Sequence, residues 1–218
     1  MHDDVFASPQ VAPLAVAVAR GDVAAIRRAL ATIHPDTPGS DGSTLLIAAI
    51  ADGNLAGAQA LLDGGADPNR AGKGGETPVH AAAFAEDARL LDAVLAHGGD
   101  ADIRNATTGE TPLARAILGL GRANVRRLLA AGADPNLADR NGNTPLHVAG
   151  SVNAGDTLLV LLDAGALPMK RNAAGDTFQP YYFRIRRELL NERALAERRA
   201  VVEWLQRHGV PLEAVAER

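Results

Sequence analysis

The sequence predicts an all-α solenoid of about six stacked helix–loop–helix–turn units, the last enlarged into a C-terminal cap. One motif returns at a nearly fixed period, and its threonines, 33, 34, 33 and 33 residues apart, are Thr44, Thr77, Thr111, Thr144 and Thr177. The 218 residues are 47% hydrophobic but only 3% aromatic, which suits thin layers of closely approaching helices better than a compact core rich in large rings. A single unit of this length cannot bury its apolar face alone, so neighbouring units must stack.

The local chemistry of each unit predicts where its helices begin and end. Threonine is a good N-cap, because its oxygen accepts from a free amide of the first turn, and proline suits the first helical position. An alanine-rich helix follows, then a short loop and a second helix with leucines at helical spacing. The second helix ends at glycine, which tolerates the left-handed conformation, and a sequence such as Asp-Pro-Asn then makes a turn without a central strand.

We expect a single domain over residues 1–218, built of six such units. The first is degenerate, and its segment ARGDVAAIRRAL matches the second-helix half of the others. The sixth carries 11 extra residues, because Thr177 and Gly209 are 32 residues apart whereas Thr144 and Gly165 are 21 apart. If wholly helical, these residues add roughly 16 Å. The approximate bounds of the units are 9–41, 42–74, 75–108, 109–141, 142–174 and 175–212.

The repeated motifs resemble those of the ankyrin-repeat family. They read Gly-x-Thr-Pro-Leu/Val-His-x-Ala, best seen at 75–82 and 142–149, and Gly-Ala-Asp-Pro-Asn, at 65–69 and 132–136. The resemblance is to a small, stand-alone bacterial member. It implies an ankyrin-repeat solenoid that binds another protein through its concave surface and the finger tips between repeats. Two units depart from the motif, with Leu45 and Ile47 in place of proline and histidine, and Ala114 in place of histidine.

On this resemblance, the partner-binding residues lie on the concave face and the finger tips. The expected tip residues are Lys73, Glu76, Glu110, Arg140, Asn143 and Asp176. From the first helices we expect Phe84 and Leu118, because apolar groups exposed together mark a binding patch. The alternative is that one or both of these side chains pack between units.

The segment from Phe178 to Trp204 holds five of the seven aromatic residues and several arginines. Tyrosine, tryptophan, phenylalanine and arginine are enriched at interface hot spots, so we expect a second contact surface in this insertion, at Tyr181, Tyr182 and Arg184. The alternative is a structural cap, since the last unit of a solenoid needs a polar outer face. Apolar and charged residues alternate here at helical spacing, which favours a cap with or without partner contact.

No motif predicts a catalytic, cofactor or metal site, so we expect no enzyme. The chain has no cysteine, which excludes thiol chemistry and disulfides. His80 and His147 share one repeat position two units apart, too far apart to bind one ion, and the resemblance gives them a structural role between neighbouring repeats. We expect Asp67, Asp102 and Asp134 each to accept from backbone amides of their own turn.

The net charge of the chain and the length of its apolar runs limit the kinds of partner that we expect. A net charge of −4 and a pI near 5.8 give no footprint for nucleic acid or an anionic membrane. No apolar run approaches about 18 residues, so we expect a cytoplasmic protein, monomeric when free, that binds another protein. One alternative is an immunity- or antitoxin-type inhibitor that neutralises a co-produced toxin or effector by occupying its surface. Another is a structural protein that associates with itself through residues 178–204.

Overall fold

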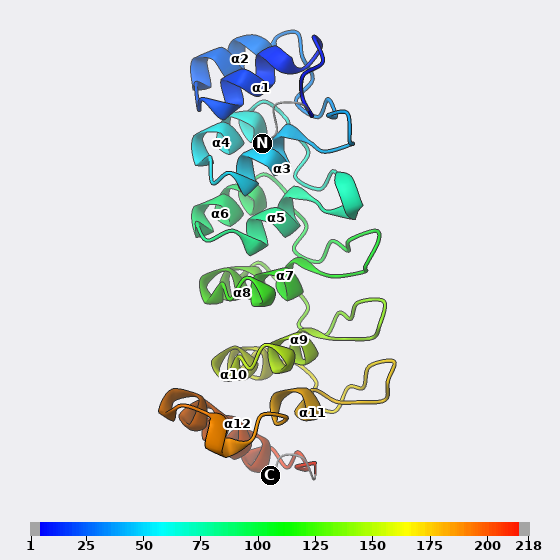
Figure 1. The fold of residues 1–218 in the computed structure, drawn as a ribbon, viewed down its shortest axis with the longest axis vertical. Helices are drawn as coiled ribbons and strands as arrows, with labels where there is room; N and C mark the ends of the chain where they lie inside the picture. Colours follow the sequence, from blue (N-terminus) through cyan, green and yellow to red (C-terminus); the bar gives the residue numbers. More distant parts are fainter. Residues whose placement is uncertain (1–4, 214–218) are drawn as a thin grey trace.

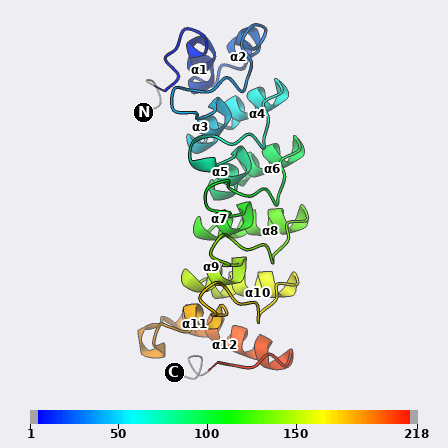
Figure 2. The same ribbon diagram turned by 90° about the vertical axis from the view of Figure 1, so that its right-hand side faces the viewer.

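The computed structural model describes residues 5–213, and its helices stack in a single file (Figure 1). Each unit has a first and a second helix, and the two sets of helices form two columns (Figure 2). The loops between successive units, called finger loops below, project from one side of the stack. Residues 5–213 contain no strand, and the predicted all-α solenoid is confirmed.

The helices alternate along the chain between the two columns. The first helices are α1 (Ala12–Ala19), α3 (Leu45–Ala51), α5 (Pro78–Phe84), α7 (Pro112–Leu118), α9 (Pro145–Ser151) and α11 (Gln179–Tyr182). The second helices are α2 (Val23–Leu30), α4 (Leu55–Asp63), α6 (Ala88–Ala96), α8 (Arg122–Ala130), α10 (Gly155–Asp163) and α12 (Glu192–Arg207). Two short 3-10 turns are η1 (Lys73–Gly75) and η2 (Arg187–Leu189).

The threonine motif starts the first helices as predicted. The hydroxyl oxygens of Thr44, Thr77 and Thr111 accept from the amide three residues ahead, at 3.3, 3.4 and 3.3 Å. Proline is the first residue of α5, α7 and α9, where its missing amide costs no helical hydrogen bond. In the last unit Thr177 accepts from the amide of Gln179 at 3.2 Å, where α11 begins. The spacing of these caps therefore sets the spacing of the stacked layers.

His80 and His147 tie their units to the next ones, as the resemblance implied. Nε2 of His80 donates to the carbonyl oxygen of Glu110, and Nε2 of His147 to that of Asp176, both at 3.0 Å. Because a carbonyl only accepts, Nε2 carries the proton, and Nδ1 accepts from the capping threonine hydroxyl at 2.8 Å in both units. Burial lowers the pKa of both imidazoles below the ordinary value of 6.5, since their charged form is poorly solvated there.

Side chains in the turns after the second helices form a ladder along the stack. One oxygen of each turn accepts from a backbone amide of the following turn, at 2.8 to 3.1 Å, and the acceptors are Asp36, Asn69, Asp102 and Asn136. The predicted bonds within the turn are present for Asp67 and Asp134, but the prediction for Asp102 is wrong. This turn reads Gly-Gly-Asp-Ala-Asp, so Asp102 stands at the position of the closing asparagine, and Asp100 makes the local bond.

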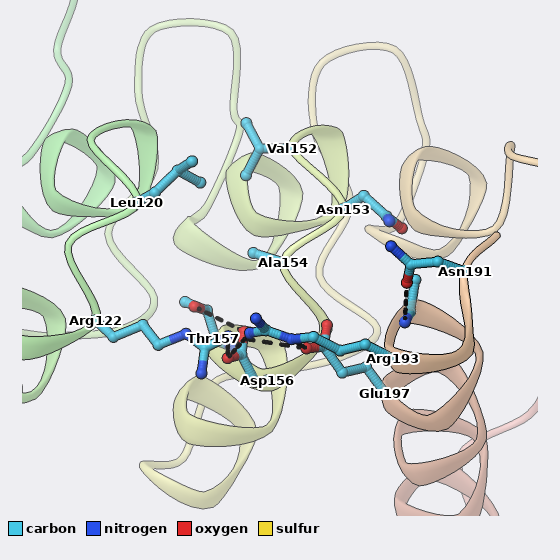
Figure 3. A pocket seen from close by; sticks show the side chains of 11 residues that line it. Leu120, Arg122, Val152, Asn153, Ala154, Asp156, Thr157, Asn191, Arg193 and Glu197 are labelled. Carbon is cyan, nitrogen blue, oxygen red and sulfur yellow. Dashed lines mark hydrogen bonds and ion pairs between the residues drawn. The ribbon is translucent and has the colours of Figure 1, made fainter.

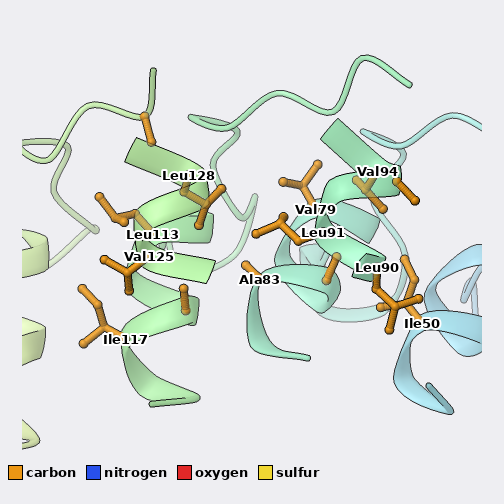
Figure 4. Close-up of a cluster of buried hydrophobic side chains, with 14 of the residues drawn as sticks. Ile50, Val79, Ala83, Leu90, Leu91, Val94, Leu113, Ile117, Val125 and Leu128 are labelled. Atoms are coloured by element: carbon orange, nitrogen blue, oxygen red, sulfur yellow. The ribbon is translucent and has the colours of Figure 1, made fainter. Parts of the chain in front are cut away.

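The core is a thin layer that continues from unit to unit. Figure 4 shows aliphatic side chains of neighbouring helices meeting in it, among them Val79, Leu91, Leu113 and Leu128. Alanines such as Ala83 are fully buried where α5 and α7 pack together. A small side chain at such a contact allows the helices to approach closely, so this architecture needs few aromatic rings.

The last unit departs from a wholly helical insertion. α11 has four residues and α12 has 16, whereas the second helices α4, α6, α8 and α10 have nine each. Between them, residues 183–191 form a link that contains only the short turn η2. Arg198 holds this link from inside, because its guanidinium donates to the Ile185 carbonyl at 2.7 Å and lies 4.9 Å from the centre of the Phe183 ring. Phe178 and Phe183 are fully buried, so these rings cover the end of the stack.

Candidate partner-binding surface

The groove face, which consists of the first helices and the finger loops, carries a cluster centred on Arg115. The guanidinium of Arg115 pairs with Glu76 at 3.2 Å and with Glu110 at 4.0 Å, and lies 4.7 Å from the centre of the Phe84 ring. Burial raises the pKa of the Glu110 carboxyl, and the charge of Arg115 opposes that shift. Sequence reasoning missed Arg115, although its first-helix position holds alanine or valine in units two, three and five. The structure therefore brings three of the expected residues together through one that was not expected.

The finger loops use much of their polar surface to bind one another. Lys73 pairs with an aspartate of the preceding loop at 3.4 Å. Arg140 donates to carbonyl oxygens of the preceding loop, through its backbone amide at 3.1 Å and also through its guanidinium. Asn143 accepts from the side-chain amide of Asn172 at 2.9 Å. These side chains lie in the finger loops as expected, but their polar groups are already engaged within the chain.

Large apolar side chains are exposed where the first helices of the third and fourth units end. Phe84, Leu118 and Leu120, called the apolar strip below, are 47%, 40% and 68% exposed. The Phe84 ring lies against the chain between the two leucines, because a Cβ added at Gly119 would lie 3.2 Å from that ring. Phe84 and Leu118 are therefore not packed away between units, which was the alternative left open by the sequence. Leu120 was missed because it belongs to a loop position in the repeat pattern.

The loop between α5 and α6 differs from four other loops of the same length. In those four, the residue before the second helix donates its amide to the carbonyl five residues back, which ends the first helix. After α5, Ala85 is extended, with ψ of 144°, and Asp87 makes no such bond in the described structure. The buried side chain of Asn124, on α8, ends α5 instead. Its Nδ2 donates to the carbonyls of Ala82, Ala83 and Ala85 at 3.4, 3.0 and 2.8 Å.

A hollow of about 670 Å³, called the acidic hollow below, opens beside this loop between α3 and α5. Its floor is apolar and includes Ile47, Ile50 and Leu90. One arginine and four carboxylates line it, and the carboxylates belong to Asp52, Glu76, Glu86 and Asp87. An apolar floor under an acidic rim matches a long basic side chain, whose stem is apolar and whose head is charged.

A second depression, of about 520 Å³, lies between the fourth unit and the cap and is called the cap-side cleft below (Figure 3). Leu120 and Val152 line it, opposite a group of charged side chains. In that group Arg193 pairs with Glu197 at 2.9 Å, and Arg122 pairs with Asp156. Histidine, cysteine, serine and lysine are absent from its lining, so the cleft offers ion pairs and no nucleophile paired with a base.

Two models of one family match the chain. The model described as Ankyrin repeats (many copies) matches residues 45–95, and the model described as Ankyrin repeats (3 copies) matches residues 79–172. The chain is an ankyrin-repeat protein. A crystal structure of the ankyrin-repeat protein EF0377 has the same fold, with a TM-score of 0.75 and 23% identity over 90% of this chain and 98% of that one.

Curated relatives of this ankyrin-repeat protein differ widely in length. Protein PhlB of Serratia liquefaciens is 46% identical over 140 residues, which is 64% of this chain and 62% of PhlB. The E3 ubiquitin-protein ligase KEG of Arabidopsis thaliana is 29% identical over 219 aligned positions, which is 92% of this chain and 13% of KEG. The chain thus spans less than two thirds of either relative.

The last ankyrin unit corrects one of the expected contacts. Tyr182 is only 2% exposed, and its ring packs edge-on against Phe183 at 5.0 Å, so it belongs to the core of the cap. Burial also raises the pKa of its phenol. Tyr181 is half-buried, and its hydroxyl donates to Asp176 at 3.3 Å. Arg184 is exposed and donates to a carbonyl of α9 at 3.0 Å, so of the three expected residues it alone is exposed.

Two kinds of site are absent from residues 5–213 of this ankyrin-repeat protein. No group of three histidine or carboxylate side chains gathers there in an arrangement that holds a metal ion. None of the helices in that range has the length and apolar character needed to cross a membrane. The surface features that the proposals below use are the apolar strip, the acidic hollow and the cap-side cleft.

Proposed function

We propose that this ankyrin-repeat protein is a non-enzymatic module that binds another protein through its groove face. Ankyrin repeats indicate a protein–protein interaction module. The observation that carries the proposal is the apolar strip, which exposes three large side chains of the third and fourth units. Charged residues line the acidic hollow together with Phe84 and the cap-side cleft together with Leu120. An apolar centre with a polar rim is the usual anatomy of a protein interface.

The rigidity of the stack supports this function. The histidine bonds and the turn ladder hold each unit against the next, so the groove face is formed before a partner arrives. Preorganisation of this kind lowers the entropy cost of association. Affinity then depends on a few anchors, of which Phe84 and Arg115 are the best placed on the groove face.

The absence of enzymatic activity is part of the same proposal. The cap-side cleft holds ion pairs between arginines and carboxylates, and among its lining residues only Thr157 has a hydroxyl group. That hydroxyl donates to Asp156 at 3.5 Å, and no histidine lines the cleft to take its proton. Both family models that match the chain describe ankyrin repeats, which supports an interaction module.

The finer roles are special cases of this proposal. A chain that binds by covering its partner's surface acts as an inhibitor when that surface is the working site of a toxin or effector. We further propose a cytoplasmic protein that is monomeric until it meets its partner. Measurement of the mass in solution at several concentrations checks this, because association through residues 178–204 would raise the mass with concentration.

Photo-crosslinking in the cells that make the chain tests the proposal. A photoreactive amino acid replaces Leu118 in one variant and Glu203, an exposed residue of α12, in the control. We expect a covalent adduct with one protein from position 118 and none from position 203, and Phe84→Ser should remove the adduct. Adducts at 203 with none at 118 would place the interface outside the groove face.

A further inference from the structure

Leu120 occupies a backbone conformation that leucine rarely adopts. Its φ is 54°, in the left-handed region, where the Cβ of an L-residue crowds the following carbonyl. The equivalent loop positions hold Gly21 and Gly53, which adopt this conformation without strain, and Asn153, which tolerates it. Leucine thus stands at a site where the fold itself favours glycine. Strained residues of this kind tend to mark functional sites.

The side chain of Leu120 is mostly exposed in the free protein. It is 68% exposed, so burial does not offset the strain of its backbone. In the apolar strip it follows Gly119, which packs against Phe84, and it also lines the cap-side cleft with Val152. Leu120 therefore connects the centre of the groove face with the cap.

The acidic hollow gives the other end of this surface its charge. Four carboxylates line it against one arginine, and Glu76 is already paired with that arginine. Asp87 is paired with Arg89 at 2.7 Å. Glu86 is exposed and forms no ion pair among the described residues. A cation placed in the hollow gains the field of these carboxylates, whereas an acidic side chain meets repulsion.

We propose that Leu120 is a further anchor of the partner-binding surface, alongside Phe84 and Arg115, and that the partner is a protein segment with a large apolar side chain followed within about one helical turn by lysine or arginine. The apolar side chain packs on the strip, and the basic one enters the acidic hollow with its stem on Ile50 and its head near Glu86. This inference rests on the proposed function and names the chemistry of the partner.

A random 16-residue peptide display library, panned against the full chain, supplies the probe. Enriched peptides are synthesised and titrated by fluorescence anisotropy against four variants. Leu120→Gly is paired with Asn153→Gly, which makes the same backbone change one unit away. Glu86→Lys is paired with Glu203→Lys, which makes the same charge change on α12.

We expect enriched peptides in which a large apolar residue precedes lysine or arginine. Leu120→Gly should weaken their binding about tenfold or more, because it removes the anchoring side chain. It should also raise the melting temperature, because it relieves the backbone strain. Asn153→Gly should leave binding unchanged. Glu86→Lys should weaken binding about fivefold or more at low salt, and Glu203→Lys should not.

Several results would overturn the inference. Enriched peptides that are acidic, or that bind Leu120→Gly as well as the parent, contradict it while leaving the proposed function intact, provided that Phe84→Ser abolishes their binding. Peptides indifferent to Phe84→Ser, or no enrichment, count against both. A self-association that Leu120→Gly abolishes would make a second copy the occupant, since the exposed Leu189 is followed four residues later by Arg193.

Discussion

Replacing Asn124 by alanine removes the side chain that ends α5. Its two shorter hydrogen bonds, 2.8 and 3.0 Å long, go to the carbonyls of Ala85 and Ala83, and each buried carbonyl left without a donor costs about 1–3 kcal/mol. One contribution opposes this loss. Oδ1 of Asn124 is itself buried without a hydrogen-bond partner in the described structure, so its removal returns about 1 kcal/mol. The Ala85 carbonyl is only partly buried, so we take the lower half of this range, about 3–4 kcal/mol for the two carbonyls together, which leaves a net destabilisation of about 2–3 kcal/mol.

Thermal and urea unfolding followed by far-ultraviolet circular dichroism measure this change. For a chain of this size, about 2–3 kcal/mol lowers the melting temperature by about 5–10 °C. The matched control is Asn141→Ala, because Asn141 is exposed and its side chain makes no hydrogen bond among the described residues. This variant should melt within about 1 °C of the parent. In Asn124→Ala, the hydrogen-exchange rates of backbone amides should rise more in α5 than in α9.

A second substitution tests the cause. Glu86 holds the loop position at which Gly21 and Gly53 have φ of 63° and 68°. Glu86→Gly should allow the loop after α5 to close its own helix, as those loops do, and should restore at least half of the stability lost in Asn124→Ala. Equal stability of Asn124→Ala and the parent, or additive effects of the two substitutions, would refute the role assigned to Asn124.

Two further predictions concern the histidines and the cap. Burial lowers the pKa of His80 and His147 below 6.5, so the unfolded chain binds more protons than the folded one as the pH falls. The free energy of unfolding should therefore fall as the pH drops below 6.5. Urea titrations from pH 8 to pH 5 should show this decrease, and the His80→Gln/His147→Gln double variant should show a smaller one. Gly155→Ala should destabilise by about 1–3 kcal/mol, because the new Cβ would overlap the Tyr182 hydroxyl. Thermal melts check it, and adding Tyr182→Phe should recover part of the loss.

The repeat pattern made most of the fold predictable. A threonine cap followed by proline has the same local physics wherever it occurs, so the starts of α5, α7 and α9 could be read directly. The bonds of His80 and His147 to the next unit followed from the family resemblance. These features depend on nearby residues and on one fixed contact between neighbours.

The features that escaped prediction depend on differences between units. Asp102 was assigned the wrong partner because unit three lacks the proline and asparagine that mark the register of its turn. Asn124 acts on a helix about 40 residues away, and no motif of its own unit signals this. The role of Arg115 could have been found only by comparing the first-helix positions of different units. Its surroundings are formed by Glu76, Glu110 and Phe84 together. Tyr182 is buried because the last unit folds its extra residues back over the stack.

The turn ladder gives the stack a direction. Each acceptor side chain belongs to the earlier unit and each donated amide to the later one. During synthesis on the ribosome, Asp36 is made before Asp67, and Asn136 before Leu167. Each new unit can therefore pack against a preceding unit that already holds the acceptor oxygen. Within this set of bonds, loss of a C-terminal layer leaves a side-chain acceptor oxygen facing water, whereas loss of an N-terminal layer removes the acceptor of a backbone amide. The direction of these bonds thus matches the order in which the units are synthesised, from the N-terminal end to the C-terminal end.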